Sequence, residues 1–383
     1  MENRIIYWFR NDLRLDDNEA FWMAAEDATE LLPVYIFDPR RFRFRDPGFR
    51  KTGLNRACRI LEAVRNLQEK LQEKQGNLVI RVGEPEKIIA ELAKVHGVAE
   101  VRASKEITLE ETNVEASLSK RLKGINVDIS LTWMSTLIHP HDLPVYISRL
   151  PEEYSQFAEM IRQTQIRNPI TEKETIPFLT GETGFALPDL RELGFGEDEL
   201  KTGVQLSRRS TTEAELRLQI VTGRVEIEEL LNLISSGLIS PRLAYHLTKD
   251  MPNATSLYDQ LSWRDYLQFL ALKYGTRLFK PSGLVHRIDQ QWKYDKESFH
   301  RWKEGKTAVP EIDRSMEALA EKGTLSFGDT KIVAQYLIGE LGVNWTWGAA
   351  WFESQLTNYE VALNWGIWNY FAGVGPGKKE EFL

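Results

Sequence analysis

Residues 4–18 read Arg4-Ile5-Ile6-Tyr7-Trp8-Phe9-Arg10-Asn11-Asp12-Leu13-Arg14-Leu15-Asp16-Asp17-Asn18, an apolar run that turns abruptly into a charged loop. The β-branched and aromatic residues at its start are typical of a buried strand. Similar runs recur at residues 31–37, 78–82, 98–103 and 126–132. Amphipathic stretches with helical spacing separate them, at residues 56–74, 86–96 and 113–123. This alternation predicts a parallel sheet covered on both faces, a Rossmann-like α/β domain over residues 1–135.

The rest of the chain has a different pattern. Residues 136–205 are rich in proline and glycine and are expected to form a linker. From residue 206 to residue 383 the periodicity is helical throughout, which predicts an all-α second domain. Its helices are expected at residues 213–221, 226–235, 240–249, 257–274, 296–304, 310–322, 330–342 and 345–360.

Composition narrows the function classes. A chain of 383 residues with 42% hydrophobic and 27% charged residues is ordinary globular protein, and two domains suit its length. It has no apolar run of the roughly 20 residues that a membrane span needs. The single cysteine excludes a disulfide framework and favours a reducing compartment, so we expect a cytoplasmic protein. The net charge of −7 disfavours general nucleic-acid binding, the histidines show no metal-ligand spacing, and eleven tryptophans are an unusual excess.

Several motifs together resemble one known family. The opening run resembles the W-F-R-x-D-L-R-x-x-D-N start of the photolyase/cryptochrome family, and its DASH-type branch is similar at further segments along the chain. These segments are residues 105–111, 239–242, 263–266, 271–275, 302–307, 345–354 and 364–375. The resemblance implies an α/β antenna domain followed by a helical domain that buries FAD, which agrees with the two domains expected from periodicity.

The resemblance also assigns roles to individual residues. Trp368, Trp345 and Trp292 match the family's chain of three tryptophans that passes electrons from the surface to the excited flavin. For any single tryptophan, core packing remains the alternative. The residues that match FAD-binding positions are Arg264, Asn358, Glu360 and Asn364, the last of which faces the flavin N5 atom in the family.

The positions that serve DNA repair in the family are substituted. Repair-competent relatives carry a Glu three residues before Trp263, where it hydrogen-bonds the damaged pyrimidine, and this chain has Gln260. Glutamine forms hydrogen bonds but cannot accept a proton as a carboxylate does. The family's N-R-x-R is replaced by Phe327-Gly328-Asp329-Thr330. Its second Arg pairs with an Asp in the family, and here both positions are neutral, Thr330 and Asn358. We therefore expect weak or lost pyrimidine-dimer repair.

Two further departures concern the cofactors. The family's hydroxyl-rich cradle for the FAD pyrophosphate aligns with residues 227–231, which include Glu228 and Glu229, unless a gap moves it to Thr211 and Thr212. Relatives also continue beyond the position of Leu383, so we expect fewer walls around the flavin. Glu106 and Glu110 match a folate-type antenna site, with solvated carboxylates at a helix start as the alternative.

Three functions remain open at this stage. The first is a blue-light-responsive flavoprotein close to the DASH branch, with weak contact to DNA and a signalling partner that the sequence does not identify. The second is a cofactor-poor binding or scaffold protein that keeps the photolyase fold. The third is an active pyrimidine-dimer photolyase, which requires the substitutions at Gln260 and Phe327 to be harmless.

Overall fold

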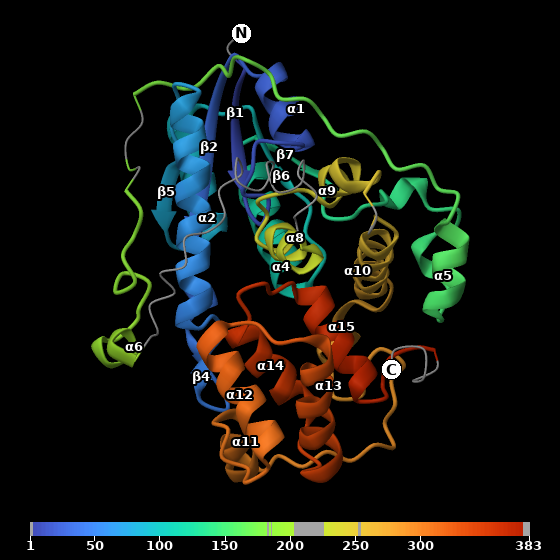
Figure 1. Ribbon diagram of the computed structural model, residues 1–383. Helices are drawn as coiled ribbons and strands as arrows, with labels where there is room; N and C mark the ends of the chain where they lie inside the picture. Colours follow the sequence, from blue (N-terminus) through green and yellow to red (C-terminus); the bar gives the residue numbers. More distant parts are fainter. Residues whose placement is uncertain (1–2, 182–183, 185, 203–225, 252–253, 378–383) are drawn as a thin grey trace.

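The N-terminal part of the chain forms the parallel sheet that the sequence predicts (Figure 1). The computed structural model describes residues 3–181, 184, 186–202, 226–251 and 254–377. Its five parallel strands lie in the order β5-β2-β1-β6-β7, with β1 in the centre. Their bounds are β1 Arg4–Phe9, β2 Glu30–Phe37, β5 Val79–Val82, β6 Glu100–Ser104 and β7 Asp128–Thr132.

Helices cover both faces of this sheet, because alternate strand residues point to opposite sides. Ile5, Tyr7 and Phe9 pack with α1 (Glu19–Asp27) and α2 (Leu54–Glu73). Ile6 and Trp8 pack with α3 (Pro85–His96) and α4 (Leu109–Lys123) on the other side. Helix α1, which the sequence analysis missed, begins where the Asn18 side chain accepts a hydrogen bond from the Phe21 amide.

The segment expected to be a linker is packed against both parts of the molecule. In Figure 1 its green trace runs from α5 (Tyr154–Ile161) across the N-terminal end of the sheet to α6 (Glu197–Thr202). Ile176 and Phe195 are buried in the α/β core. The remaining short elements are η2 Pro140–Asp142 and η3 Ile147–Arg149 here, and η1 Pro39–Phe42, β3 Phe44–Arg45 and β4 Phe49–Arg50 in the α/β part.

The C-terminal part is helical in every element that the structure describes. Its α-helices are α8 Ile227–Ser235, α9 Pro241–Thr248, α10 Ala254–Tyr274, α11 Lys296–Lys303, α12 Pro310–Lys322, α13 Phe327–Gln335, α14 Trp345–Gln355 and α15 Val361–Phe371. A 3₁₀ turn, η4 Gly275–Phe279, and a π turn, η5 Tyr336–Glu340, follow α10 and α13. The helix expected at residues 213–221 lies outside the described residues.

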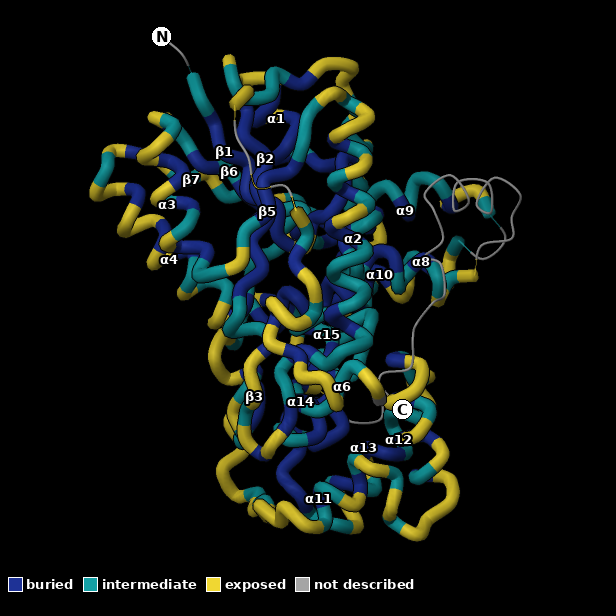
Figure 2. Tube along the Cα trace, turned by 90° about the vertical axis from the view of Figure 1, so that its left-hand side faces the viewer, coloured by how far each residue is buried: buried dark blue, intermediate teal, exposed yellow. Residues whose placement is uncertain are grey.

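Helix α15 is the centre of this part. It is apolar nearly all round, as a helix buried on every side must be, and it packs against α10 and α14. The helix expected at residues 345–360 ends instead at Gln355, because the Thr357 amide donates to the Gly323 carbonyl. Figure 2 shows buried segments in the sheet above and in α14 and α15 below. Among the described helices none is long and apolar enough to cross a bilayer.

Candidate functional site

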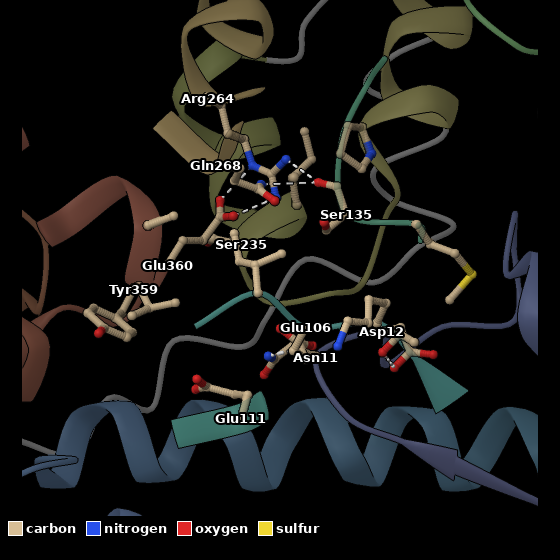
Figure 3. Close-up of a pocket in the computed structure, with 18 of the residues that line it drawn as sticks. Asn11, Asp12, Glu106, Glu111, Ser135, Ser235, Arg264, Gln268, Tyr359 and Glu360 are labelled. Carbon is tan, nitrogen blue, oxygen red and sulfur yellow. Dashed lines mark hydrogen bonds and ion pairs between the residues drawn. The ribbon is translucent and has the colours of Figure 1, made fainter. Parts of the chain in front are cut away.

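A cavity of about 120 Å³ lies between the sheet and the helical part. Its helical wall is organised by Arg264 on α10, which is 5% exposed. The Arg264 guanidinium donates to both carboxylate oxygens of Glu360, at 2.8 and 2.5 Å, and to the Ser135 carbonyl. Gln268, one turn further along α10, donates to the same carbonyl at 3.2 Å. Figure 3 shows these side chains converging from α10 and from the start of α15.

The opposite wall comes from the charged loop after β1. The Asp12 carboxylate accepts hydrogen bonds from the Tyr7 hydroxyl at 2.6 Å and the Ser104 hydroxyl at 3.0 Å, which fixes the loop on the sheet edge. Arg14 is 4% exposed, and no residue that the structure describes accepts a hydrogen bond from its Nε. Burial lowers the pKa of Arg14 from its ordinary value. A buried cation with an unused donor therefore borders the cavity.

Glu106 lies on this wall and is the antenna candidate nearest to Arg264. Its carboxylate accepts a hydrogen bond from Asn11 Nδ2 at 3.0 Å. The pKa of Glu106 is raised to about 7, chiefly by loss of solvation; Arg10 opposes this shift and the nearby Glu111 adds to it. Glu106 thus borders the interdomain cavity, on the opposite side from Glu360.

Glu110 borders a different and larger cavity, of about 390 Å³, at the carboxyl ends of β1 and β2. This is where open α/β sheets commonly bind ligands. Trp8 and Tyr35 supply aromatic wall, and Arg40 joins the Asp38 and Glu86 carboxylates at 2.7 to 2.9 Å. The exposed Glu110 carboxylate contacts Lys51. The structure therefore does not bring the two antenna candidates to one cavity.

Two of the three relay tryptophans are held together by one backbone group. Trp292 Nε1 and Trp345 Nε1 both donate to the Pro281 carbonyl, each at 3.0 Å. Trp292 is partly exposed and Trp345 is fully buried, so the pair leads from the surface inward. Trp368 is 1% exposed and packs with Phe352 at 5.3 Å between ring centroids. Its Nε1 has no partner among the described residues.

The remaining FAD candidates lie around α15. Asn364 is 6% exposed, and its Nδ2 donates to the Ala349 carbonyl on α14 at 2.9 Å. Asn358 Nδ2 donates to Asn232 Oδ1 on α8 at 2.8 Å. The Thr330 hydroxyl instead donates to the Ser326 carbonyl, one turn earlier at the N-cap of the same helix. Asn358 thus has a neutral partner, but that partner comes from α8 rather than from α13.

The repair-associated positions face outward. Gln260 is exposed on α10. Trp263 is half-buried, with its ring centroid 5.0 Å from that of Tyr154 and 5.7 Å from that of Tyr370. Phe327 is 50% exposed at the start of α13. The candidates Gln260 and Trp263 are therefore accessible from solvent to different degrees and belong to one helix.

Sequence reasoning missed four residues of this site. Ser135 and Gln268 complete the polar wall around Arg264. Trp365 and Glu353 form a hydrogen-bonded pair between α14 and α15. Trp365 stands inside the quoted segment of residues 364–375, so its position there was a usable signal, whereas Ser135 acts through its carbonyl and leaves no signal in its side chain.

Comparison with known proteins decides the family. Residues 5–175 match the DNA photolyase domain, and residues 256–382 match the FAD binding domain of DNA photolyase. Cryptochrome DASH of Gloeobacter violaceus is 33% identical over 97% of this chain and 79% of its own length. The chain belongs to the DNA photolyase/cryptochrome family. It is similar to the DASH cryptochromes within that family and carries its FAD-binding domain.

Solved structures agree with this placement. The Synechocystis sp. PCC6803 cryptochrome has a TM-score of 0.89 and 31% identity, covering 99% of this chain and 84% of that one. An archaeal photolyase from Sulfolobus tokodaii, described with two FAD molecules and a proposed light-harvesting role, has a TM-score of 0.79 at 22% identity, covering 97% of this chain and 83% of that one. That second likeness shows the fold alone.

The chemistry of the interdomain site fits FAD. Arg264, Gln268 and the unused Arg14 Nε are donors suited to flavin carbonyls or to a pyrophosphate. Glu228, one of the carboxylates at the aligned cradle position, is exposed on α8, so solvent screens its repulsion. The cavity of about 120 Å³ is smaller than the roughly 300–1,000 Å³ typical of ligand sites. Admission of a dinucleotide therefore requires its wall side chains to move apart.

Proposed function

We propose that this protein is a blue-light-responsive flavoprotein in which Trp292, Trp345 and Trp368 pass electrons toward FAD, with weak or no pyrimidine-dimer repair. The single observation that carries the relay is the shared Pro281 carbonyl, which holds the partly exposed Trp292 and the buried Trp345 side by side. Rigid helices suit electron transfer because they fix ring separations. FAD, when bound, supplies the light absorption and accepts the electron.

The chain's own residues would hold and tune that cofactor. Arg264 and Glu360 form a buried ion pair beside the cavity, which positions a guanidinium without leaving an unpaired charge. Asn364 is one turn of α15 beyond Glu360 and offers an amide rather than a carboxylate. The hydrogen bond from Asn358 to Asn232 connects the segment before α15, which would border the flavin, to α8, the helix that aligns with the pyrophosphate cradle.

The first test is an absorption spectrum of the purified protein, followed by blue-light photoreduction with an external electron donor. We expect a flavin spectrum, and we expect Trp368→Phe and Trp345→Phe to slow photoreduction strongly. Trp22→Phe is the matched control, because Trp22 is also buried but lies on α1 in the α/β part, where its Nε1 donates to the Leu15 carbonyl. A colourless protein that refuses added FAD would overturn the proposal and leave the cofactor-poor scaffold.

We propose weak repair because the residues at two repair-associated positions, Gln260 and Phe327, differ from those of repair-competent relatives. Gln260 cannot accept a proton as a carboxylate does, and Phe327 presents an exposed apolar ring where repair-competent relatives carry Asn. We expect little light-dependent repair of a single strand that contains a pyrimidine dimer. The double variant Gln260→Glu with Phe327→Asn should raise the rate. Efficient repair by the unaltered protein would support the active-photolyase alternative.

We also propose a folate-type antenna at the two candidate positions, Glu106 and Glu110. Glu110 borders the 390 Å³ cavity, whose aromatic and cationic walls suit a planar, anionic chromophore. Glu106 borders the other cavity and serves such a chromophore only if it reaches between the domains. Extraction of the protein and analysis of released pigments tests this, with Glu110→Ala and Glu106→Ala compared for pigment content. Weak DNA contact and a signalling partner remain proposals alongside it.

A further inference from the structure

Trp365 is the tryptophan that meets the inner end of the Trp292–Trp345 pair. Its ring centroid lies 6.0 Å from that of Trp345, with the planes at 72°. Phe279 packs on it at 4.9 Å, and the residue is 7% exposed. Trp365 therefore extends the row of indoles that begins at the surface with Trp292.

The hydrogen bond of Trp365 differs in kind from those of its neighbours. Trp365 Nε1 donates to Glu353 Oε2 at 3.3 Å, whereas Trp292 and Trp345 donate to a neutral carbonyl. Glu353 is 4% exposed, so its carboxylate acts in a poorly solvated environment, where electrostatic interactions are strong. Arg45 contacts Glu353 at 3.1 Å and keeps that carboxylate from being an isolated buried charge.

This arrangement favours loss of an electron and a proton from Trp365. Removal of an electron leaves the indole positively charged and its N–H strongly acidic. A carboxylate at the N–H stabilises that charge and accepts the proton, which a backbone carbonyl cannot do at comparable cost. Trp365 should therefore lose an electron more readily than Trp345 does.

We propose that Trp365 and Glu353 form a proton-coupled side branch of the relay. The proposal rests on the proposed function, in which photoexcited flavin first oxidises the tryptophan relay. One electron passes from Trp365 to the oxidised Trp345, which returns to its closed-shell state. The Trp365 Nε1 proton moves to Glu353 Oε2, and the products are a neutral indolyl radical and a carboxylic acid. The reverse transfer of one electron and one proton restores both residues.

The test oxidises the full chain without light or flavin. Azidyl radicals generated by pulse radiolysis remove one electron from exposed indoles, and transient absorption separates the neutral indolyl radical from its protonated cation. We expect a long-lived neutral radical in the unaltered protein. Trp365→Phe should lose most of this long-lived signal. Glu353→Gln, which keeps a hydrogen-bond acceptor but not a proton acceptor, should leave mainly the cation.

Two controls separate this role from packing. Arg45→Gln removes the closer ion pair of Glu353, leaves the one with Lys51 at 3.8 Å and keeps the carboxylate, so it should retain the neutral radical. Trp22→Phe removes a buried indole of the α/β part that donates to the Leu15 carbonyl, and it should also retain the signal. An unchanged neutral-radical yield in Trp365→Phe, or equal losses of that yield in Arg45→Gln and Glu353→Gln, would overturn the proposed branch.

Circular dichroism of each variant identifies loss of fold. Since no flavin takes part, failure of the photoreduction experiment does not affect this result.

Discussion

At the scale of single residues, charge pairing around the interdomain cavity decides what the site can bind. Arg264 and Glu360 neutralise each other at 2.5 to 2.8 Å, and Arg264 is almost fully buried. Across the cavity, Arg56 stacks its guanidinium 4.0 Å from the Tyr359 ring centroid, and burial lowers the pKa of Arg56 to about 10. Glu106 borders this cavity and the pKa of its carboxyl group is raised to about 7, so it makes the site sensitive to pH. Burial also raises the pKa of Asp265, which lies 3.9 Å from Arg264, to about 7.

Replacement of Glu106 by Gln should change how stability depends on pH. The folded protein holds the Glu106 proton more tightly than the unfolded chain, because the pKa rises from 4.5 to about 7 on folding. The stability that this group contributes is therefore present below pH 4.5 and is lost as the pH rises through about 7. Urea unfolding at several pH values should show Glu106→Gln gaining on the unaltered protein over that interval.

The matched control for this pH experiment is Glu110→Gln. The Glu110 side chain is 68% exposed, so its replacement should leave the pH dependence of unfolding nearly unchanged. Parallel pH profiles for Glu106→Gln and the unaltered protein would contradict the burial of the Glu106 carboxyl group in the cavity wall.

At the scale of elements, close approach of α14 and α15 depends on one glycine. A Cβ at Gly348 on α14 would lie 2.3 Å from the Trp368 ring on α15. Gly348→Ala should therefore push Trp368 or the two helices apart, at about 1–3 kcal/mol of the free energy of unfolding. Chemical unfolding measures the loss, and tryptophan fluorescence should report a changed environment for Trp368.

Gly339→Ala, in the π turn η5, is the control for Gly348→Ala. A Cβ at Gly339 meets no atom within 4 Å, and the residue is exposed, so this change should be neutral or slightly stabilising. Equal losses in the two variants would contradict the prediction, because the cost would then not come from contact with the Trp368 ring.

The elements also show what the sequence can and cannot predict. Strands such as Arg4–Phe9 were predictable because β-branched and aromatic residues mark buried strands in a local pattern. Helix α15 carries no polar face, so periodicity did not predict it, and residues 364–375 were recognised only as a family motif. The end of α14 depends on the distant Gly323 carbonyl, and the pairing of Trp292 with Trp345 depends on the Pro281 carbonyl. Such tertiary contacts through backbone groups leave no trace in residue type.

At the scale of the whole molecule, two buried carboxylates join the sheet to the helical part. Glu353 on α14 meets Arg45, and its backbone carbonyl accepts a hydrogen bond from Arg56 at 2.9 Å. Asp17, after β1, accepts from the Ser240 hydroxyl at 2.5 Å and pairs with Arg242 at the start of α9. The interdomain cavity lies between these two connections, so its width depends on both.

Asp17→Ala should weaken the connection beyond the loss of a surface ion pair. Asp17 is 2% exposed and also accepts a hydrogen bond from the Ile170 amide at 2.8 Å. Its removal takes the acceptor from the Ser240 hydroxyl and the Ile170 amide, and among the described residues it leaves Arg242 with only its 3.4 Å contact to Glu19. Removal of one partner of a buried pair typically costs about 3–5 kcal/mol. The matched surface variant Glu84→Ala, which breaks an exposed pair with Lys87, should cost less than about 1 kcal/mol.

Asp17→Ala should also make the α/β part and the helical part unfold in separate transitions. Most tryptophans lie in the helical part, so their fluorescence follows that part, while far-ultraviolet circular dichroism follows both. Coincident transitions in the unaltered protein and displaced ones in Asp17→Ala would indicate that Asp17 couples two cores that are each hydrophobic enough to unfold separately. Coincident transitions in both proteins, with a loss as small as that of Glu84→Ala, would instead mean that other contacts, such as those between α2 and α14, carry the coupling. The cavity width would then not depend on the Asp17–Arg242 pair.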